Sequence, residues 1–138
     1  MKKKVFTAMG LMSGTSMDGV DLSLIKSNGH DEFTAILDKY FEFDKNLQRK
    51  LIAFRDQLNT KNDLEKYSRE LQALEREFTL FHVKILDEIL NNSKHKIELI
   101  GFHGQTVLHN SEKKISKQIG DGKLLSQLTK KIVINNFR

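Results

Sequence analysis

The chain has 138 residues, of which 38% are hydrophobic and 30% charged, a composition typical of one folded domain and not of a disordered segment. The formal net charge is +5, but basic and acidic residues alternate along the chain, so no nucleic-acid-binding surface is indicated. The absence of cysteine excludes disulfides, a thiolate nucleophile and a cysteine-ligated metal.

No apolar run approaches the ~18 residues of a membrane span. The basic start, Met1 to Lys4, resembles the beginning of a secretory signal, but the apolar run behind it is short and leads directly into a glycine-rich turn. We therefore expect a cytoplasmic protein that contacts neither membranes nor nucleic acid.

The first third of the chain predicts strands. A short apolar run at Val5–Met12 and an alternating run at Val20–Ile25 are joined by a link too short for a crossover helix, so they should form an antiparallel hairpin. A turn at 27–31 leads to a third strand, Phe33–Phe43. On one side of that strand we expect Phe33, Ala35, Leu37, Phe41 and Phe43.

Helical spacing follows. Asp44 is a good N-cap for a helix whose apolar stripe ends at Leu58. Thr60 and Asp63 resemble a capping box for a second helix of about thirty residues, which ends near Asn92 and has apolar residues at every third or fourth position. A coiled coil is an alternative explanation of that spacing, although it would span few heptads.

The last third predicts shorter elements. Lys96–Phe102 is nearly continuously apolar, as in a strand covered on both faces. Ile115–Ile119 is a strand or a loop edge, Asp121–Thr129 a short helix and Lys131–Ile134 a final strand. This order predicts an α/β fold, with a mixed β-sheet flanked by helices.

The turn between the first two strands carries the most specific chemistry. Gly14 and Gly19 permit positive φ and close approach of a ligand, while Thr15 and Ser16 offer hydroxyl and backbone donors to phosphate oxygens. Asp18 would bind a hydrated Mg²⁺ that bridges the phosphates. An ordinary β-turn explains the same composition, and the spacing is neither a Walker loop nor a dinucleotide fingerprint.

Residues 10–21, Gly-Leu-Met-Ser-Gly-Thr-Ser-Met-Asp-Gly-Val-Asp, resemble the opening signature of the anhydro-N-acetylmuramic acid kinase family. The resemblance implies an actin-like, ribonuclease H-like (hexokinase-type) nucleotide-binding fold, with ATP and Mg²⁺ as cofactors. It implies ATP binding at Gly14, Thr15, Ser16, Met17, Asp18, Gly19, Val20 and Asp21, with the metal at Asp18.

Two further segments agree with the family. Residues 101–109 resemble its His-Gly-Gln-Thr-Val-x-His stretch, and 118–122 resemble its Gln-x-Gly-Asp element. They follow a predicted strand, where α/β sheets usually place ligands. The resemblance implies binding of the sugar substrate at His103, Gln105, Thr106 and Gln118.

The other histidines have simpler explanations. His109 is expected to tie down its loop, because a third ligand at metal-binding spacing is missing. His82 and His95 are expected to be ordinary residues of a helix surface and a loop.

The family reaction uses ATP and water to open the 1,6-anhydro ring of anhydro-N-acetylmuramic acid and yields N-acetylmuramic acid 6-phosphate, a step of peptidoglycan recycling and amino-sugar catabolism. The final segment resembles a strand that ends in Asp-Phe-Arg in the family, but Asn136 replaces the Asp. The resemblance places the general base in or beyond the segment that ends at Arg138, so the catalytic residue is not identified.

We therefore expect residues 1–138 to form an amino-terminal sugar-kinase domain that lacks the family's second domain and is inactive alone. Half of a split enzyme, completed by a carboxyl-terminal chain, is one alternative. A non-catalytic module that binds nucleotide or sugar, or forms a homodimer, is another. A different sugar kinase of the same superfold and a helical scaffold also stay open.

Overall fold

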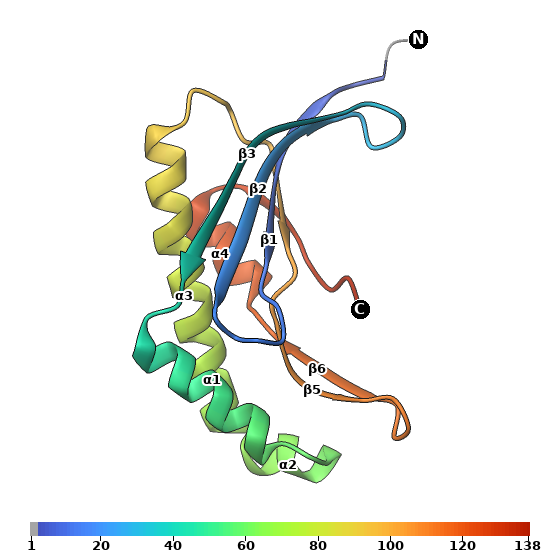
Figure 1. Cartoon of the computed structure of the whole chain (residues 1–138), viewed down its shortest axis with the longest axis vertical. Helices are drawn as coiled ribbons and strands as arrows, with labels where there is room; N and C mark the ends of the chain where they lie inside the picture. Colours follow the sequence, from blue (N-terminus) through green and yellow to red (C-terminus); the bar gives the residue numbers. More distant parts are fainter. Residues whose placement is uncertain (1–2) are drawn as a thin grey trace.

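The computed structural model describes residues 3–138; Met1 and Lys2, the first residues of the signal-like start, lie outside that part. Within it are a five-stranded sheet, a two-stranded hairpin and four helices (Figure 1). In chain order these are β1 (Phe6–Met12), β2 (Gly19–Ser27), β3 (Phe33–Glu42), α1 (Lys45–Gln57), α2 (Lys61–Lys66), α3 (Ser68–Asn92), β4 (Leu99–Phe102), β5 (Gln105–Asn110), β6 (Ile115–Ile119), α4 (Gly122–Thr129) and β7 (Ile132–Ile134).

The large sheet has the order β3-β2-β1-β4-β7. β2 pairs antiparallel with β1 and β3, which confirms the predicted hairpin, whereas β1, β4 and β7 run parallel. The parallel pairs β1–β4 and β4–β7 need crossover connections, which contain the helices. Because both crossovers run in the same direction along the sheet, their helices lie on the same face of it. The predicted α/β fold, with a mixed sheet flanked by helices, is confirmed.

The register of β3 corrects one prediction. Leu24 pairs with Leu37 but the next residue, Ile25, pairs with Ala35, so a bulge at Ile36 interrupts the alternation. Because paired residues share a face, Phe33 and Ala35 lie on the face opposite to that of Leu37. The expectation that all five apolar residues of this strand share one side is therefore wrong.

The helical region differs from the single predicted helix. Tyr67, with φ −102° and ψ 20°, separates α2 from α3. The predicted capping box is present at the start of α2: Thr60 Oγ1 accepts from the Asp63 N–H at 3.2 Å, and Asp63 Oδ2 accepts from the Thr60 N–H at 2.9 Å. The apolar stripe of α3 belongs to the core of this domain, with Phe78 and Leu86 completely buried, and not to a coiled coil.

Two further predictions change in the last third of the chain, and both concern β4. β4 begins at Leu99, three residues later than expected, and is covered on one face only, since Ile100 is buried while Gly101 lines an open groove. The strand predicted as one alternative for residues 115–119 is confirmed as β6, and its partner β5 was not predicted.

His82 is not a helix-surface residue. Its ring packs against the rings of Phe78 and Phe102, at centroid distances of 4.4 and 4.9 Å, and the residue is 1% exposed. Nδ1 contacts the Phe78 carbonyl oxygen at 2.8 Å. Burial lowers the pKa of His82 to about 4, because the charged form of the ring is unfavourable in a place that water does not reach. His95 does lie in a loop, as expected.

Among residues 3–138, no helix is both long enough and apolar enough to cross a membrane.

Candidate functional site

The loop 13–18 joins β1 to β2 at the end of the sheet where β1 and β4 terminate (Figure 1). It is a tight turn in which the Met17 N–H donates to the Gly14 carbonyl oxygen at 3.2 Å. Thr15, Ser16 and Asp18 are exposed to solvent. The hydroxyl and carboxylate groups predicted to meet phosphate and metal are therefore accessible.

The conformational role expected of the loop glycines is taken by Met17. Neither Gly14 nor Gly19 has a positive φ, whereas Met17 has φ +57°. The Met17 and Val20 side chains are fully buried, which anchors the turn in the core and leaves only their backbone available to a ligand. At Gly19 a β-carbon would collide with the Phe41 carbonyl oxygen, so this glycine permits close packing of β2 against β3.

Gln105 connects this loop to the predicted sugar-binding segment. Its side chain is completely buried, and Nε2 donates to the Gly14 carbonyl oxygen at 3.0 Å and to the Thr106 carbonyl oxygen at 3.3 Å. The His103 N–H also donates to the Leu11 carbonyl oxygen at 3.1 Å. The loop therefore lies beside the His103 segment, as one site for nucleotide and sugar requires.

The remaining predicted sugar-binding residues lie on and beside the β5–β6 hairpin. Gln118 Nε2 donates to Thr106 Oγ1 at 3.0 Å. His103 and Gln118 line a cavity of about 40 Å³ together with the segment 135–138, which is room for a few waters and not for a sugar. His109 is exposed on β5. The structure thus brings His103 and Gln118 to one cavity but leaves it small.

Two glycines hold the two sugar-side motifs in contact. Gly104 and Gly120 have φ +80° and +143°, values that disfavour any side chain. A β-carbon on Gly120 would lie 3.2 Å from Gly104 Cα, and one on Gly104 would collide with the Ile119 carbonyl oxygen. The backbones of the two motifs therefore touch directly.

Three buried polar atoms have no hydrogen-bond partner among residues 3–138: Ser13 Oγ, His103 Nε2 and Gln105 Oε1. Such atoms are rare in folded proteins, because each costs free energy to desolvate. All three belong to the loop or to the segment that Gln105 connects to it. Their concentration here marks this end of the sheet as a candidate binding site.

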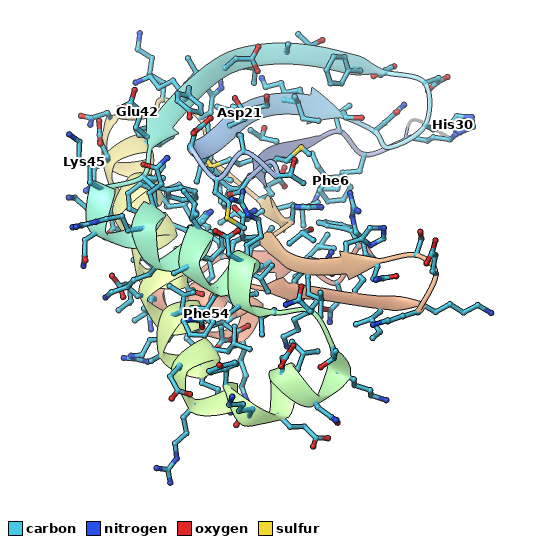
Figure 2. All side chains as sticks on the ribbon, turned by 60° about the horizontal axis from the view of Figure 1, so that its bottom comes forward. Phe6, Asp21, His30, Glu42, Lys45 and Phe54 are labelled. Atoms are coloured by element: carbon cyan, nitrogen blue, oxygen red, sulfur yellow. The ribbon has the colours of Figure 1, made fainter. Side chains whose placement is uncertain are left out.

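A more open hollow of about 370 Å³ is lined by Asp18, Tyr40, Glu42, Lys45 and Gln48. Asp18 Oδ1 accepts from Gln48 Nε2 at 3.3 Å. Desolvation, followed by the negative charges of Asp18, Glu42 and Asp21, raises the pKa of Tyr40. Figure 2 shows Asp21, Glu42 and Lys45 at this end of the sheet and His30 at the far turn.

Asp18 suits a phosphate-bound Mg²⁺ better than a cation held by protein alone. Within residues 3–138, no group of three or more His, Asp or Glu side chains is placed to hold a metal. Mg²⁺ commonly takes one or two carboxylates and completes its shell with water and substrate phosphates. A single exposed carboxylate next to the candidate phosphate loop fits that arrangement.

Several residues that support the site carry no motif signal. On α3, Glu75 Oε2 accepts from the Gly120 N–H at 3.0 Å, and Thr79 Oγ1 accepts from the Asp121 N–H at 3.0 Å. Arg55 of α1 donates to the Thr15 carbonyl oxygen at 3.4 Å. Sequence spacing gave no sign of these contacts, apart from the polar Thr79 in an otherwise apolar helical stripe.

Comparison of the amino-acid sequence with known proteins identifies similar proteins of one family. A family model described as anhydro-N-acetylmuramic acid kinase matches residues 6–138. A protein of that name from Pelagibacter ubique (strain HTCC1062) is 52% identical over 136 residues, which are 99% of this chain and 36% of the relative. Another from Agrobacterium fabrum (strain C58 / ATCC 33970) is 36% identical over 141 residues, covering 98% of this chain and 37% of the relative.

The chain therefore spans about a third of the length of the curated relatives it matches. The match extends through β1 to β7 and includes the loop, the His103 segment and the Gln118 segment. On these grounds the chain belongs to the anhydro-N-acetylmuramic acid kinase family.

Proposed function

We propose that this chain supplies the phosphate loop and part of the sugar site of a cytoplasmic, ATP-dependent kinase. The kinase would use water to open the 1,6-anhydro ring of anhydro-N-acetylmuramic acid and would phosphorylate the 6-oxygen. The observation that carries the proposal is the hydrogen bond from Gln105 to the Gly14 carbonyl oxygen, because it joins the two motif segments in one site. The family match supports the choice of substrates.

In this proposal the loop acts by positioning and by charge. Phosphoryl transfer depends mainly on in-line alignment and on stabilising charge on the phosphoryl oxygens. The exposed backbone and hydroxyls of Thr15 and Ser16 would bind the terminal phosphates, and Asp18 would hold the Mg²⁺. The bound metal would neutralise phosphate charge.

Water activation requires a further group. The residues that line the cavity at His103 and Gln118 include no Asp or Glu side chain, and Asn136 is neutral where the family motif has Asp. Asn136 has φ +61°, a conformation that asparagine adopts more readily than most residues. We infer that a general base from another polypeptide segment completes the site, so that this chain alone binds ligands without turnover.

The test is an ATP- and Mg²⁺-dependent assay on the purified 138-residue chain, alone and mixed with the carboxyl-terminal two-thirds of the Pelagibacter relative. We expect nucleotide binding by calorimetry, no phosphorylation by the chain alone, and phosphorylation of the anhydro sugar in the mixture. Turnover by the chain alone would refute the need for a complementing segment. No binding of nucleotide or sugar, alone or mixed, would refute the proposed function.

A second candidate is a non-catalytic module that senses nucleotide or sugar, or that forms a homodimer. It is favoured by the uncovered face of the sheet, where a groove of about 510 Å³ is lined mainly by apolar residues. Binding that persists without turnover in the mixture would favour this module over the kinase.

A further inference from the structure

Gln105 occupies a position that a direct sugar ligand would not. Its side chain is 0% exposed, and its amide nitrogen donates to two backbone carbonyl oxygens, those of Gly14 and Thr106. Carbonyl oxygens only accept, so these contacts fix which end of the amide carries the N–H groups. The nitrogen end is therefore fully committed to the protein.

The Gly14 contact spans 91 residues of sequence and connects two predicted subsites. Gly14 begins the turn, and its carbonyl oxygen also accepts from the Met17 N–H. A donor that holds this carbonyl in place thereby orients the peptide groups of residues 14–17. Gln105 is itself the first residue of β5, next to Thr106. Its hydrogen bond to Gly14 therefore fixes the position of the loop relative to the hairpin that carries the sugar-side residues.

We propose that Gln105 is a positioning residue that holds the phosphate loop in its binding conformation through the Gly14 carbonyl and does not contact the sugar. The identity of the ligands rests on the proposed function, whereas the effect on the loop does not. Its oxygen, Oε1, is buried without a hydrogen-bond partner among residues 3–138 and adds no accessible surface for a sugar.

The first test measures amide hydrogen exchange by NMR on the 138-residue chain. Gln105→Met keeps the length of the side chain and removes both donors. We expect the loop amides, Met17 above all, to exchange about tenfold faster, while amides of β2 and α3 keep their rates. Unchanged loop exchange would overturn the proposal, and so would a uniform acceleration, because that would indicate general destabilisation.

Thr129→Val is the matched control. Thr129 is also buried and donates to a backbone carbonyl, that of Leu125 at 2.7 Å, but it lies on α4 away from the loop. This variant loses a comparable hydrogen bond and should leave loop exchange as in the unmodified chain. Acceleration of the loop amides in Thr129→Val would overturn the assignment of the effect to Gln105.

Gln105→Glu provides a second variant if Gln105→Met does not fold. A neutral carboxylic acid can donate one hydrogen bond to the Gly14 carbonyl, whereas a carboxylate would face two carbonyl oxygens. At each pH the exchange rate of the loop amides in Gln105→Glu is divided by the rate in Thr129→Val. We expect this ratio to decrease as the pH falls through the pKa of the introduced carboxyl group. A ratio independent of pH would overturn the proposal.

Calorimetry separates positioning from sugar contact. Gln105→Met should weaken Mg²⁺-ATP binding about tenfold and leave the affinity for the anhydro sugar nearly unchanged. The opposite result, weaker sugar binding with nucleotide binding unchanged, would identify Gln105 as a sugar ligand and overturn the proposal. If the unmodified chain binds neither nucleotide nor sugar, alone or mixed with the complementing segment, the proposed function fails, and the exchange measurement still decides the role of Gln105.

Discussion

Gly14 and Gly10 have similar steric surroundings but different positions relative to the loop. A β-carbon on Gly14 would meet only Ser16 Oγ, at 4.0 Å, and one on Gly10 would meet nothing within 4 Å. Neither residue has a positive φ. We therefore expect both to tolerate alanine in the folded chain, and only Gly14 lies in the loop that is proposed to bind phosphate.

We expect Gly14→Ala to weaken Mg²⁺-ATP binding about tenfold, measured by calorimetry, with an unchanged thermal midpoint. Gly10→Ala is the matched control and should keep the affinity of the unmodified chain. Equal affinities for the two variants would contradict phosphate binding at residues 14–18.

His82 makes stability depend on pH. Its pKa is about 4 in the folded chain, against 6.5 for the ordinary side chain, so the unfolded state binds more protons between these values and stability falls as the pH drops from 6.5 to 4. The shift corresponds to about 2 kcal/mol of unfolding free energy lost between pH 7 and 5. Urea unfolding at both pH values should show this loss.

His82→Gln removes the titrating group and retains a donor for the Phe78 carbonyl. This variant should be less stable at pH 7 but should lose about 2 kcal/mol less than the unmodified chain on going to pH 5. An equal loss in both chains would show that other groups cause the acid sensitivity.

At the scale of single residues, sequence reasoning identified which side chains gather but not what each contacts. Motif resemblance selected the loop and the His103 segment, and both lie at one end of the sheet. It did not reveal that Met17 takes the positive φ, or that His82 is buried against two phenylalanine rings. Those outcomes depend on tertiary packing, which spacing along one helix or turn does not contain.

At the scale of elements, α2 is short and depends on its capping box. Asp63 accepts from the N–H groups of Asn59 and Thr60, which in that order lower its pKa. Its stabilising contribution is therefore present above the ordinary carboxyl range and is lost as the pH falls through the lowered pKa. No residue of α2 is buried, so packing compensates little for a lost cap.

Asp63→Ala should increase protease cleavage and hydrogen exchange within residues 59–67, while α3 stays protected. Glu65→Ala is the control, because Glu65 is exposed on the same helix and alanine keeps helix propensity. Equal protection of this segment in the two variants would show that the capping box does not hold α2 in place.

The elements that periodicity predicted and those that it missed differ in a physical way. β1, β2, α1 and α4 follow from local patterns and caps, and their predicted positions were close. The bulge at Ile36 is a property of pairing between β2 and β3, and β5 begins with the polar residues Gln105 and Thr106, which do not follow an apolar strand pattern. The break at Tyr67 accompanies packing of its ring edge-on to Phe54, at a centroid distance of 6.2 Å.

At the scale of the whole molecule, the helices cover one face of the sheet and leave the other open. The groove on the open face is lined by residues such as Ile25, Leu99 and Ile134, and Phe33 at its edge is 67% exposed. β7 is also an edge strand, with Ile132 62% exposed. Exposed apolar faces and unpaired edges promote association.

We expect the isolated chain to associate as its concentration rises, measured by sedimentation velocity, because association would bury this groove. Ile134→Lys places a charge in the groove and should shift the chain toward monomer. Leu80→Lys, at an exposed apolar position on α3, should not change the association. An unchanged association in Ile134→Lys would indicate that copies meet elsewhere.

The direct backbone contact between Gly104 and Gly120 ties the fate of the two sugar-side motifs together. A side chain at either position pushes the same pair of segments apart, so the damage from a first substitution already includes much of what a second would cause. The two glycines should thus behave as one unit under mutation. The loss of stability in the Gly104→Ala, Gly120→Ala double variant should be smaller than the sum of the losses in the two single variants, so that the effect of a change in one motif would depend on the residue in the other.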